Sequence, residues 1–414
     1  MKNQYTFIGP IHQLVTMADM PLKGALSDEA LSTINQAGLL LEGDKILKAG
    51  DFEALKSEAE KLEAEMTILD QPMVIMPGMV DSHTHICFGG SRARDYAMRN
   101  AGKTYLEIAK AGGGIWDTVT QTRKARQEEL TAGIEQRAAR HLSDGVTTIE
   151  VKSGYGLSVD EELKMLRAIQ AAATKSELIP TCLAAHIKPK DFDGDFSEYL
   201  AHIAEELFPK LKEEGLTNRM DAFIEEEAFS AEVIKPYFEK AKAMGFDITV
   251  HADQFSTSGS QVAVDFEALS ADHLEASGEE EVQLLADSDV IATALPGASM
   301  GLGCAYTPAR KILDAGGAVA VASDWNPGSA PMGDLLMQAA ILGTFQKLSN
   351  TELLAGLTYR AAAALKLQDR GRLVPGQKAD FIAFPTTHIN EVFYQQGKLK
   401  PAKVWVDGLL AFEL

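Results

Sequence analysis

The sequence predicts an α/β protein in which a (β/α)8 TIM-like barrel carries a small β-rich domain formed from both chain termini. Two observations support this fold class. From about residue 77, short apolar runs rich in β-branched residues alternate with amphipathic helical stretches, a pattern typical of parallel sheets. Eight such runs fit within about 250 residues, which suits a (β/α)8 barrel. A doubly wound open sheet is the alternative fold, but no Gly-x-Gly-x-x-Gly motif opens a helix after the first strand.

The chain divides into three predicted segments. Residues 1–76 and 371–414 form the small domain, and residues 77–370 form the barrel. A helix is expected over residues 52–65, where the spacing is helical and the exposed positions are Glu and Lys. The strands expected in the small domain are Tyr5–Ile8, Gln13–Met17, Ala37–Leu41, Lys45–Ala49, Met66–Leu69, Ala379–Phe384 and Lys403–Val406.

In the barrel, the apolar run Met73–Met76 is expected to continue to Asp81 as one buried first strand. The remaining strands are expected at Val146–Val151, Leu178–Ala184, Met220–Ile224, Asp247–Val250, Ala268–Ala271, Val290–Ala294 and Ala318–Ala322. The helices are expected at Ile115–Asp144, Asp160–Thr174, Glu198–Glu214, Ala231–Gly245, Glu279–Ala286, Leu335–Lys347 and Thr351–Lys366.

Composition narrows the class of function. The net charge of −20 disfavours binding to nucleic acid or to an anionic membrane surface, although a local Arg can still bind a small anionic substrate. Three cysteines without paired spacing suggest a reducing, cytoplasmic setting. The N-terminal residues lack the pattern of a signal peptide, and no apolar run is long enough for a membrane span.

Histidines gather at the predicted strand ends, where the active sites of such barrels lie. Five of the nine histidines stand there: His83, His85, His186, His251 and His273. His83 and His85 are two residues apart in extended chain, so they project from one face and form half of a metal site. The other four, His12, His141, His202 and His388, fall on helices or in the small domain and are interpreted as structural or solvated.

The eighth expected strand, Ala318–Ala322, leads into Asp324, which would lie beside the first strand in a closed barrel. We assign His83, His85, His251 and Asp324 as ligands of one metal ion, with Zn²⁺ and Fe³⁺ both compatible. A second ion would need a bridging carboxylate or modified lysine from a middle strand. Lys152 lies on the second strand and the fourth offers only Glu residues, so a single ion is expected.

The stretch 77–85, together with His251, His273 and Asp324, resembles the metal-dependent amidohydrolase superfamily over nearly the whole chain. Within it the sequence is more similar to the imidazolonepropionase family, through the stretches 89–92, 102–105, 111–115, 150–157, 270–275 and 324–329. That family hydrolyses the cyclic amide C–N bond of 4-imidazolone-5-propanoate to N-formimidoyl-L-glutamate in L-histidine degradation. The resemblance implies the same reaction here, by a metal-activated water, and a homodimer.

The substrate gives the matching residues roles. Its carboxylate tail suits the fork of Arg92, and Asp324 and His273 are the expected catalytic residues, although which does the main proton work stays open. The other expected substrate contacts are Tyr105, Tyr155, His186, Gln254, Asn326, Gly328 and Ser329. The run Gly112–Gly114 is interpreted as permitting a tight loop, since a phosphate cradle would need a following helix N-terminus and a phosphate to bind.

Three alternative functions are compatible with this fold: hydrolysis of another cyclic amide, deamination of a nucleobase, and a catalytically inactive barrel that serves as a binding or scaffold protein. Part of the family carries Glu where this chain has Gln254, and ring deaminases use such a Glu to protonate the base. Since a Gln side chain cannot titrate, Gln254 argues against a deaminase. The intact set of four metal ligands argues against an inactive barrel.

Overall fold

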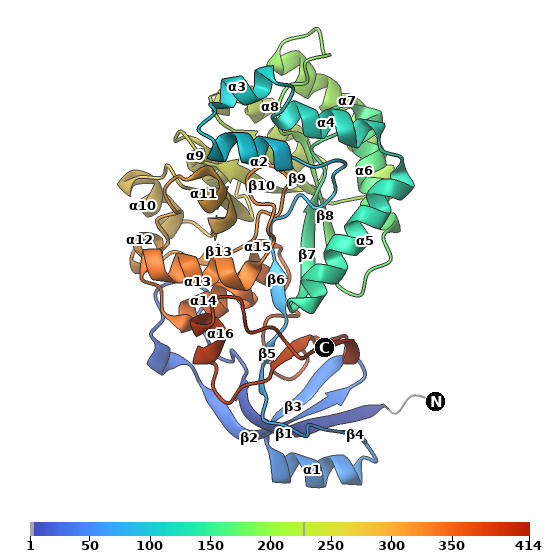
Figure 1. Ribbon diagram of the computed structural model, residues 1–414, viewed down its shortest axis with the longest axis vertical. Helices are drawn as coiled ribbons and strands as arrows, with labels where there is room; N and C mark the ends of the chain where they lie inside the picture. The colour runs from blue at the N-terminus through green and yellow to red at the C-terminus, as the bar shows by residue number, and fades with distance from the viewer. Residues whose placement is uncertain (1–3, 227) are drawn as a thin grey trace.

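The computed structural model describes residues 4–226 and 228–414, which form two separate sheets (Figure 1). The larger sheet has eight parallel strands that follow chain order from β6 to β13. They are β6 Met79–Asp81, β7 Val146–Lys152, β8 Glu177–Ala185, β9 Arg219–Ile224, β10 Asp247–Ala252, β11 Ser270–His273, β12 Ile291–Ala294 and β13 Val319–Val321.

Hydrogen bonds just beyond the ends of β6 and β13 close this sheet into a barrel. The amide of His85 donates to the carbonyl of Trp325, and the amide of Asp324 donates to the carbonyl of His83, both at 3.0 Å. The predicted (β/α)8 barrel is therefore confirmed, and its closure brings the residues after the first strand next to those after the eighth.

The smaller sheet is built from both ends of the chain, as predicted. Its strands are β1 Tyr5–Val15, β2 Thr33–Glu42, β3 Lys45–Asp51, β4 Glu65–Ile68, β5 Val74–Pro77, β14 Phe381–Phe384, β15 Lys403–Val406 and β16 Leu409–Glu413. The two ends of the chain meet where β14 pairs antiparallel with β5. Helix α1 (Phe52–Lys61) packs against β1, β2 and β3.

The expected first strand proves to be two strands in different sheets. β5 belongs to the small sheet and β6 to the barrel, and the chain crosses between them at Gly78. A Cβ atom at this position would collide with the side chain of Thr147 on β7. Glycine is therefore required for the crossing, and the prediction of one continuous strand was wrong.

The helices surround the barrel on the side that faces solvent. After α1 they are α2 Ala93–Asn100, α3 Tyr105–Lys110, α4 Ile115–Lys124, α5 Gln127–Ser143, α6 Val159–Ala171, α7 Phe196–Glu214, α8 Ala231–Ala243, α9 Gly259–Asp265, α10 Glu279–Asp287, α11 Pro296–Leu302, α12 Ala309–Asp314, α13 Leu335–Gln346, α14 Asn350–Leu357, α15 Tyr359–Ala364 and α16 Asn390–Tyr394, with one 3-10 turn at Asp28–Ala30. No helix in the described part of the chain is both long and apolar enough to cross a membrane.

Helix α7 illustrates how local sequence sets these elements. Asp195 accepts a hydrogen bond from the amide of Glu198 at 2.9 Å, and Glu198 accepts one from the amide of Asp195 at 2.8 Å, which caps the N-terminus. Gly215 ends the helix in a left-handed conformation. Its buried stripe, at helical spacing, is Tyr199, Leu200, Ile203, Ala204, Leu207, Phe208 and Leu211.

Two long predicted helices are broken. The expected helix Ile115–Asp144 is α4 and α5, because Ala125 and Arg126 are extended and Glu129 caps the amide of Arg126 at 2.8 Å. The expected helix Thr351–Lys366 is α14 and α15, which meet at a non-helical Thr358.

Helices α2, α3 and α4 lie in the segment 89–126, hereafter the cap segment. Figure 1 shows them at the end of the barrel away from the small sheet. This is the end at which the barrel strands finish, so the cap segment lies next to the rim where active-site residues of this fold gather.

Candidate active site

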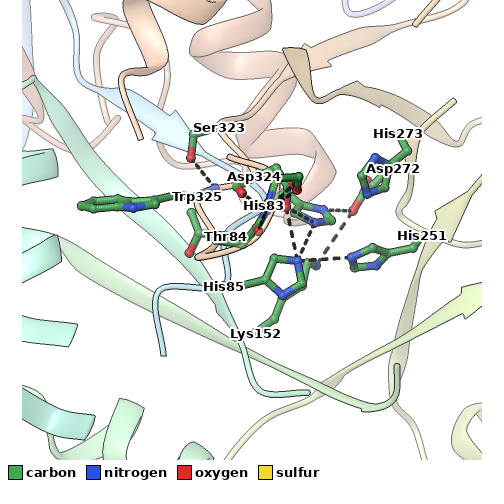
Figure 2. A network of polar contacts seen from close by, with 12 residues as sticks. His83, Thr84, His85, Lys152, His251, Asp272, His273, Ser323, Asp324 and Trp325 are labelled. Atoms are coloured by element: carbon green, nitrogen blue, oxygen red, sulfur yellow. Dashed lines mark hydrogen bonds and ion pairs between the residues drawn. The ribbon is translucent and has the colours of Figure 1, made fainter. Parts of the chain in front are cut away.

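Three histidines converge at the carboxyl ends of the strands (Figure 2). The Nε2 atom of His85 lies 3.3 Å from Nε2 of His83 and 3.3 Å from Nε2 of His251. His83 and His85 follow β6 at the predicted i, i+2 spacing, and His251 lies on β10. These three nitrogens form a group that could hold a metal ion.

Two carboxylates determine which ring nitrogen of His83 and of His251 faces the centre. Asp272 lies 2.7 Å from Nδ1 of His83, and Asp221 lies 2.9 Å from Nδ1 of His251. Each carboxylate holds the proton on Nδ1, so the Nε2 lone pair points to the shared centre. Burial lowers the pKa of His251 to about 4 and that of His85 to about 3, which keeps both rings neutral near pH 7.

Asp324 brings a carboxylate next to these nitrogens from the loop after the closing strand. Its Oδ1 atom lies 3.3 Å from Nε2 of His85 and 3.6 Å from Nε2 of His83. Its Oδ2 atom accepts a hydrogen bond of 2.9 Å from the side-chain Nδ2 of Asn326. Three neutral imidazoles and one carboxylate around a common point fit a single ion such as Zn²⁺ or Fe³⁺.

Lys152 stands behind this group and is fully engaged with carboxylates. Its ammonium lies 2.8 Å from Glu150, 2.8 Å from Asp221 and 3.9 Å from Asp272. Burial lowers the pKa of Lys152, but the charges of Asp221 and Glu150 outweigh burial, so its pKa is raised and the side chain stays charged. A lysine held in this way has no free electron pair with which to bridge two metal ions.

His273 faces the same centre from β11. Its ring centroid is 5.3 Å from that of His251, and its Nδ1 atom lies 3.4 Å from Glu275. Burial lowers the pKa of His273, but the charge and hydrogen bond of Glu275 outweigh it and the net pKa is raised. Because Nδ1 is oriented by Glu275, Nε2 is the nitrogen left for a substrate.

The centre lies at one wall of a cavity of about 350 Å³. The predicted site residues that line this cavity are His85, Arg92, Tyr155, His186, His251, Gln254, His273, Asp324, Asn326, Gly328 and Ser329. His83 lies buried behind them. Tyr105 is the first residue of α3, and its side chain lies outside the described part of the molecule.

The aromatic side of the cavity is formed by stacked rings. The ring of His186 stacks on that of His85, with centroids 5.6 Å apart and planes at 21°. Tyr155 lies 5.6 Å from His186 and 5.9 Å from His85. Nδ1 of His186 is held by the carbonyl of Gly154 at 2.9 Å, so the second ring nitrogen is available to a bound ring.

The loop after β13 is organised by Asn326. Its Oδ1 atom accepts hydrogen bonds from the amides of Gly328 at 2.7 Å and Ser329 at 2.8 Å. Its Nδ2 atom donates to the side chains of Asp324 and Ser329, both at 2.9 Å. The side chain of Asn326 therefore uses its donor and acceptor atoms to hold the loop that carries Asp324.

Two cationic residues that the sequence analysis did not assign to the site also line the cavity, Arg99 and Lys103. Arg99 donates to the carbonyls of Gly301 at 2.6 Å and Gly328 at 3.2 Å, joining α2 to α11 and to the loop after β13. The i, i+7 spacing of Arg92 and Arg99 at α2 was a usable signal, because it places both on one side of a helix. The apolar lining is Ile108, Ile115, Phe223, Phe255 and Leu302.

The sequence profile of the amidohydrolase family matches residues 74–410. The chain is also 38% identical over 408 residues to imidazolonepropionase from Deinococcus deserti, covering 98% of this chain and 99% of that protein. The chain belongs to the amidohydrolase family, in its imidazolonepropionase branch. Imidazolonepropionase from Paracoccus denitrificans is 39% identical over 367 residues, covering 87% and 92% of the two chains.

Solved structures of two other enzymes share the fold. A triazine hydrolase from Arthrobacter aurescens superposes with a TM-score of 0.73 at 15% identity, covering 99% of this chain and 95% of that one. A zinc-bound adenosine deaminase from Xanthomonas campestris superposes with a TM-score of 0.70 at 16% identity, covering 99% and 93%. At such identities the likeness concerns the fold alone, and the resemblance predicted from the motifs is confirmed by the closer relatives.

Proposed function

We propose that this amidohydrolase opens the ring of 4-imidazolone-5-propanoate by hydrolysis to give N-formimidoyl-L-glutamate, a step of L-histidine degradation. The observation that carries this proposal is the three-histidine group, with Asp324 next to two of its rings, in one cavity with Arg92. The centre suits hydrolysis of an amide, and Arg92 suits a carboxylate tail on the same small molecule.

The metal would be held by His83, His85, His251 and Asp324. When bound, such an ion lowers the pKa of a water molecule toward about 7 and makes it a nucleophile at neutral pH. The full engagement of Lys152 with Glu150, Asp221 and Asp272 supports one ion per chain rather than two. Both Zn²⁺ and Fe³⁺ are compatible with these donors.

Asp324 and His273 are the proposed catalytic residues. Water adds to the ring carbonyl carbon, the amide C–N bond breaks, and a proton passes to the departing nitrogen. Asp324 would accept the proton of the attacking water, and the hydrogen bond from Asn326 to its second oxygen supports this role. His273, oriented by Glu275, would stabilise the oxygen anion through Nε2.

The remaining cavity residues would bind the substrate. Arg92 would hold the carboxylate tail, while Tyr155, His186 and Gln254 would surround the ring. Gln254 can hydrogen-bond a ring nitrogen but cannot titrate, so Asp324 or His273 must deliver the proton. Tyr105, Gly328 and Ser329 are proposed to complete the contacts, and Asn326 to hold their loop.

The test is turnover of fresh 4-imidazolone-5-propanoate by metal-replete protein, followed by loss of its ultraviolet absorbance and by mass detection of the product. We expect steady-state hydrolysis without release of ammonia. The Asp324→Asn variant should nearly abolish kcat, because its amide cannot accept the proton of the attacking water. Absence of turnover by folded, metal-replete protein would overturn the proposal, and ammonia released from a nucleobase would instead identify a deaminase.

We further propose that residues 1–76 with 371–414 form one domain and residues 77–370 the catalytic domain, and that two chains form a homodimer in the cytoplasm. Cys87, Cys182 and Cys304 are all unpaired, which supports a reducing setting. Light scattering on the purified protein would test the dimer by giving the mass in solution.

A further inference from the structure

Helix α2 buries one residue, and that residue is a carboxylate. Asp95 is 4% exposed, whereas the other residues of α2 are partly or fully accessible. A charged side chain is buried only where partners compensate for lost water. The partners of Asp95 therefore indicate what this helix is for.

Asp95 joins two features that the sequence presents separately. Its Oδ2 atom accepts a hydrogen bond of 2.6 Å from Nε of Arg92 and one of 2.8 Å from the amide of Gly114. Gly114 precedes α4, so the carboxylate also caps the positive end of that helix. Arg92 and Ile115, the residue after Gly114, both line the cavity that contains the proposed metal centre.

The glycine run closes tightly around this carboxylate. A Cβ atom at position 113 would collide with Oδ1 of Asp95, and both Gly112 and Gly114 have φ above 80°. Only glycine meets both demands, close approach and a left-handed backbone. The run Gly112–Gly114 is thus shaped to hold Asp95, a role that goes beyond a tight turn.

Holding Nε fixes the plane of the Arg92 guanidinium. Arg92 lines the cavity, and its Nη1 atom lies beside Gly328, where a Cβ atom would be 2.9 Å away. Among the side chains that the structure describes, which leave out those of residues 105, 106 and 109, no acceptor is hydrogen-bonded to either Nη atom of Arg92. The edge of the fork formed by these two atoms is therefore free for a bidentate contact.

We propose that Asp95, locked by the loop Gly112–Gly114, is a positioning residue that aims Arg92 at the carboxylate tail of the substrate. This inference rests on the proposed function and names the device that recognises the tail. Asp95 acts through Arg92 and does not itself contact the substrate. The loop, Asp95 and Arg92 then form one unit for substrate selection.

Binding of two inert ligands by calorimetry provides the direct test, because it needs no turnover. The ligands are 3-(imidazol-4-yl)propanoate, which carries the tail, and 4-ethylimidazole, which does not. Asp95→Ala should weaken binding of the propanoate about tenfold or more, since a charge-assisted contact is lost, and leave 4-ethylimidazole within twofold. Asp95→Asn keeps an acceptor oxygen for the amide of Gly114, so its affinity for the propanoate should lie between those of the wild-type protein and Asp95→Ala.

Kinetics on the natural substrate separate positioning from structure. Asp95→Ala should raise KM with kcat nearly unchanged, and should add nothing to Arg92→Ala in the double variant. Asp117→Ala is the matched control, because it removes another carboxylate from the first turn of α4 without touching Arg92. It should leave KM unchanged.

Three results would overturn the inference. The first is that Asp95→Ala weakens binding of both inert ligands equally. The second is that adding Asp95→Ala to Arg92→Ala raises KM further. The third is that Asp117→Ala raises KM as much as Asp95→Ala does. The proposed function alone fails if the wild-type protein binds the propanoate ligand, Asp95→Ala weakens that binding, and the wild-type protein still does not hydrolyse 4-imidazolone-5-propanoate. Wild-type protein that neither binds nor hydrolyses these molecules would overturn both.

Discussion

At the scale of single residues, Lys152 links the two carboxylates that orient His83 and His251. Asp272 and Asp221 each contact one histidine on one side and Lys152 on the other. Without the ammonium, buried carboxylates would repel one another and would gain protons. Their hold on the histidine Nδ1 atoms would then weaken, although Lys152 is not itself a proposed ligand.

Replacing Lys152 by Met should therefore lower metal affinity, by about tenfold to a hundredfold as for other residues behind metal ligands. Elemental analysis and the metal-dependent rise in Tm would measure the change. Lys164→Met is the control, because Lys164 is likewise paired with a carboxylate, Glu161, but is only partly buried and lies on α6 away from the histidines. Wild-type metal retention in Lys152→Met would contradict the role.

Sequence reasoning found the proposed ligands but not the residues that orient them. His83, His85, His251 and Asp324 were visible because the ends of parallel strands meet at one rim of a barrel. Asp221 and Asp272 lie within strands, and their partners depend on strand register across the barrel. Register is a property of the folded sheet, so no local pattern reveals which histidine each carboxylate holds.

At the scale of elements, buried carboxylates tie the loops that form the rim. Glu162 on α6 accepts hydrogen bonds from the amides of Gly154 at 3.0 Å, Gly156 at 2.8 Å and Leu157 at 2.7 Å. Glu225 likewise accepts from the amide of Phe255 at 2.8 Å. Asp95 plays the same part for the cap segment, so the loops at this rim are held by carboxylates that are not among the residues lining the cavity.

Glu162→Ala should loosen the loop that carries Tyr155, because three buried amides lose their acceptor. We expect a several-fold rise in KM and a loss of about 2–4 kcal/mol in the free energy of unfolding. Steady-state kinetics and denaturant unfolding would measure the two effects. Glu161→Ala serves as the neighbouring control, since Glu161 pairs with Lys164 on a more exposed face; equal effects of both variants would refute the role of Glu162.

Most barrel strands were predictable from the sequence, whereas breaks within elements were not, and the two expected strands Tyr5–Ile8 and Gln13–Met17 proved to be the single strand β1 Tyr5–Val15. Apolar runs mark a buried strand directly, and the run Lys403–Val406 was predicted with the bounds of β15. The break between α4 and α5 contains neither Gly nor Pro, so nothing local marks it. The division of β5 from β6 depends on the close approach of Gly78 to Thr147, a contact between segments far apart in the chain.

At the scale of the whole molecule, charge is distributed unevenly. The chain carries a net charge of −20, yet the cap segment 89–126 contains eight Lys and Arg against three Asp and Glu. Arg92, Arg99 and Lys103 of this segment line the cavity. An acidic protein thus presents a basic entrance, which would draw an anionic substrate toward the site against the overall field.

This arrangement predicts a salt-dependent encounter. Because the Debye length shrinks from about 10 Å at 0.1 M to about 3 Å at 1 M ionic strength, kcat/KM should fall several-fold over that range while kcat changes little. Lys103 is half exposed, at 53%, so Lys103→Gln should lower kcat/KM at low salt and flatten its dependence on salt. Lys61→Gln, on α1 beside the small sheet, removes the same charge far from the entrance and should leave the salt dependence unchanged. Stopped-flow or steady-state rates in graded NaCl would decide the matter: a flat kcat/KM in the wild-type protein, or equal shifts in both variants, would show that the cap segment does not steer the substrate.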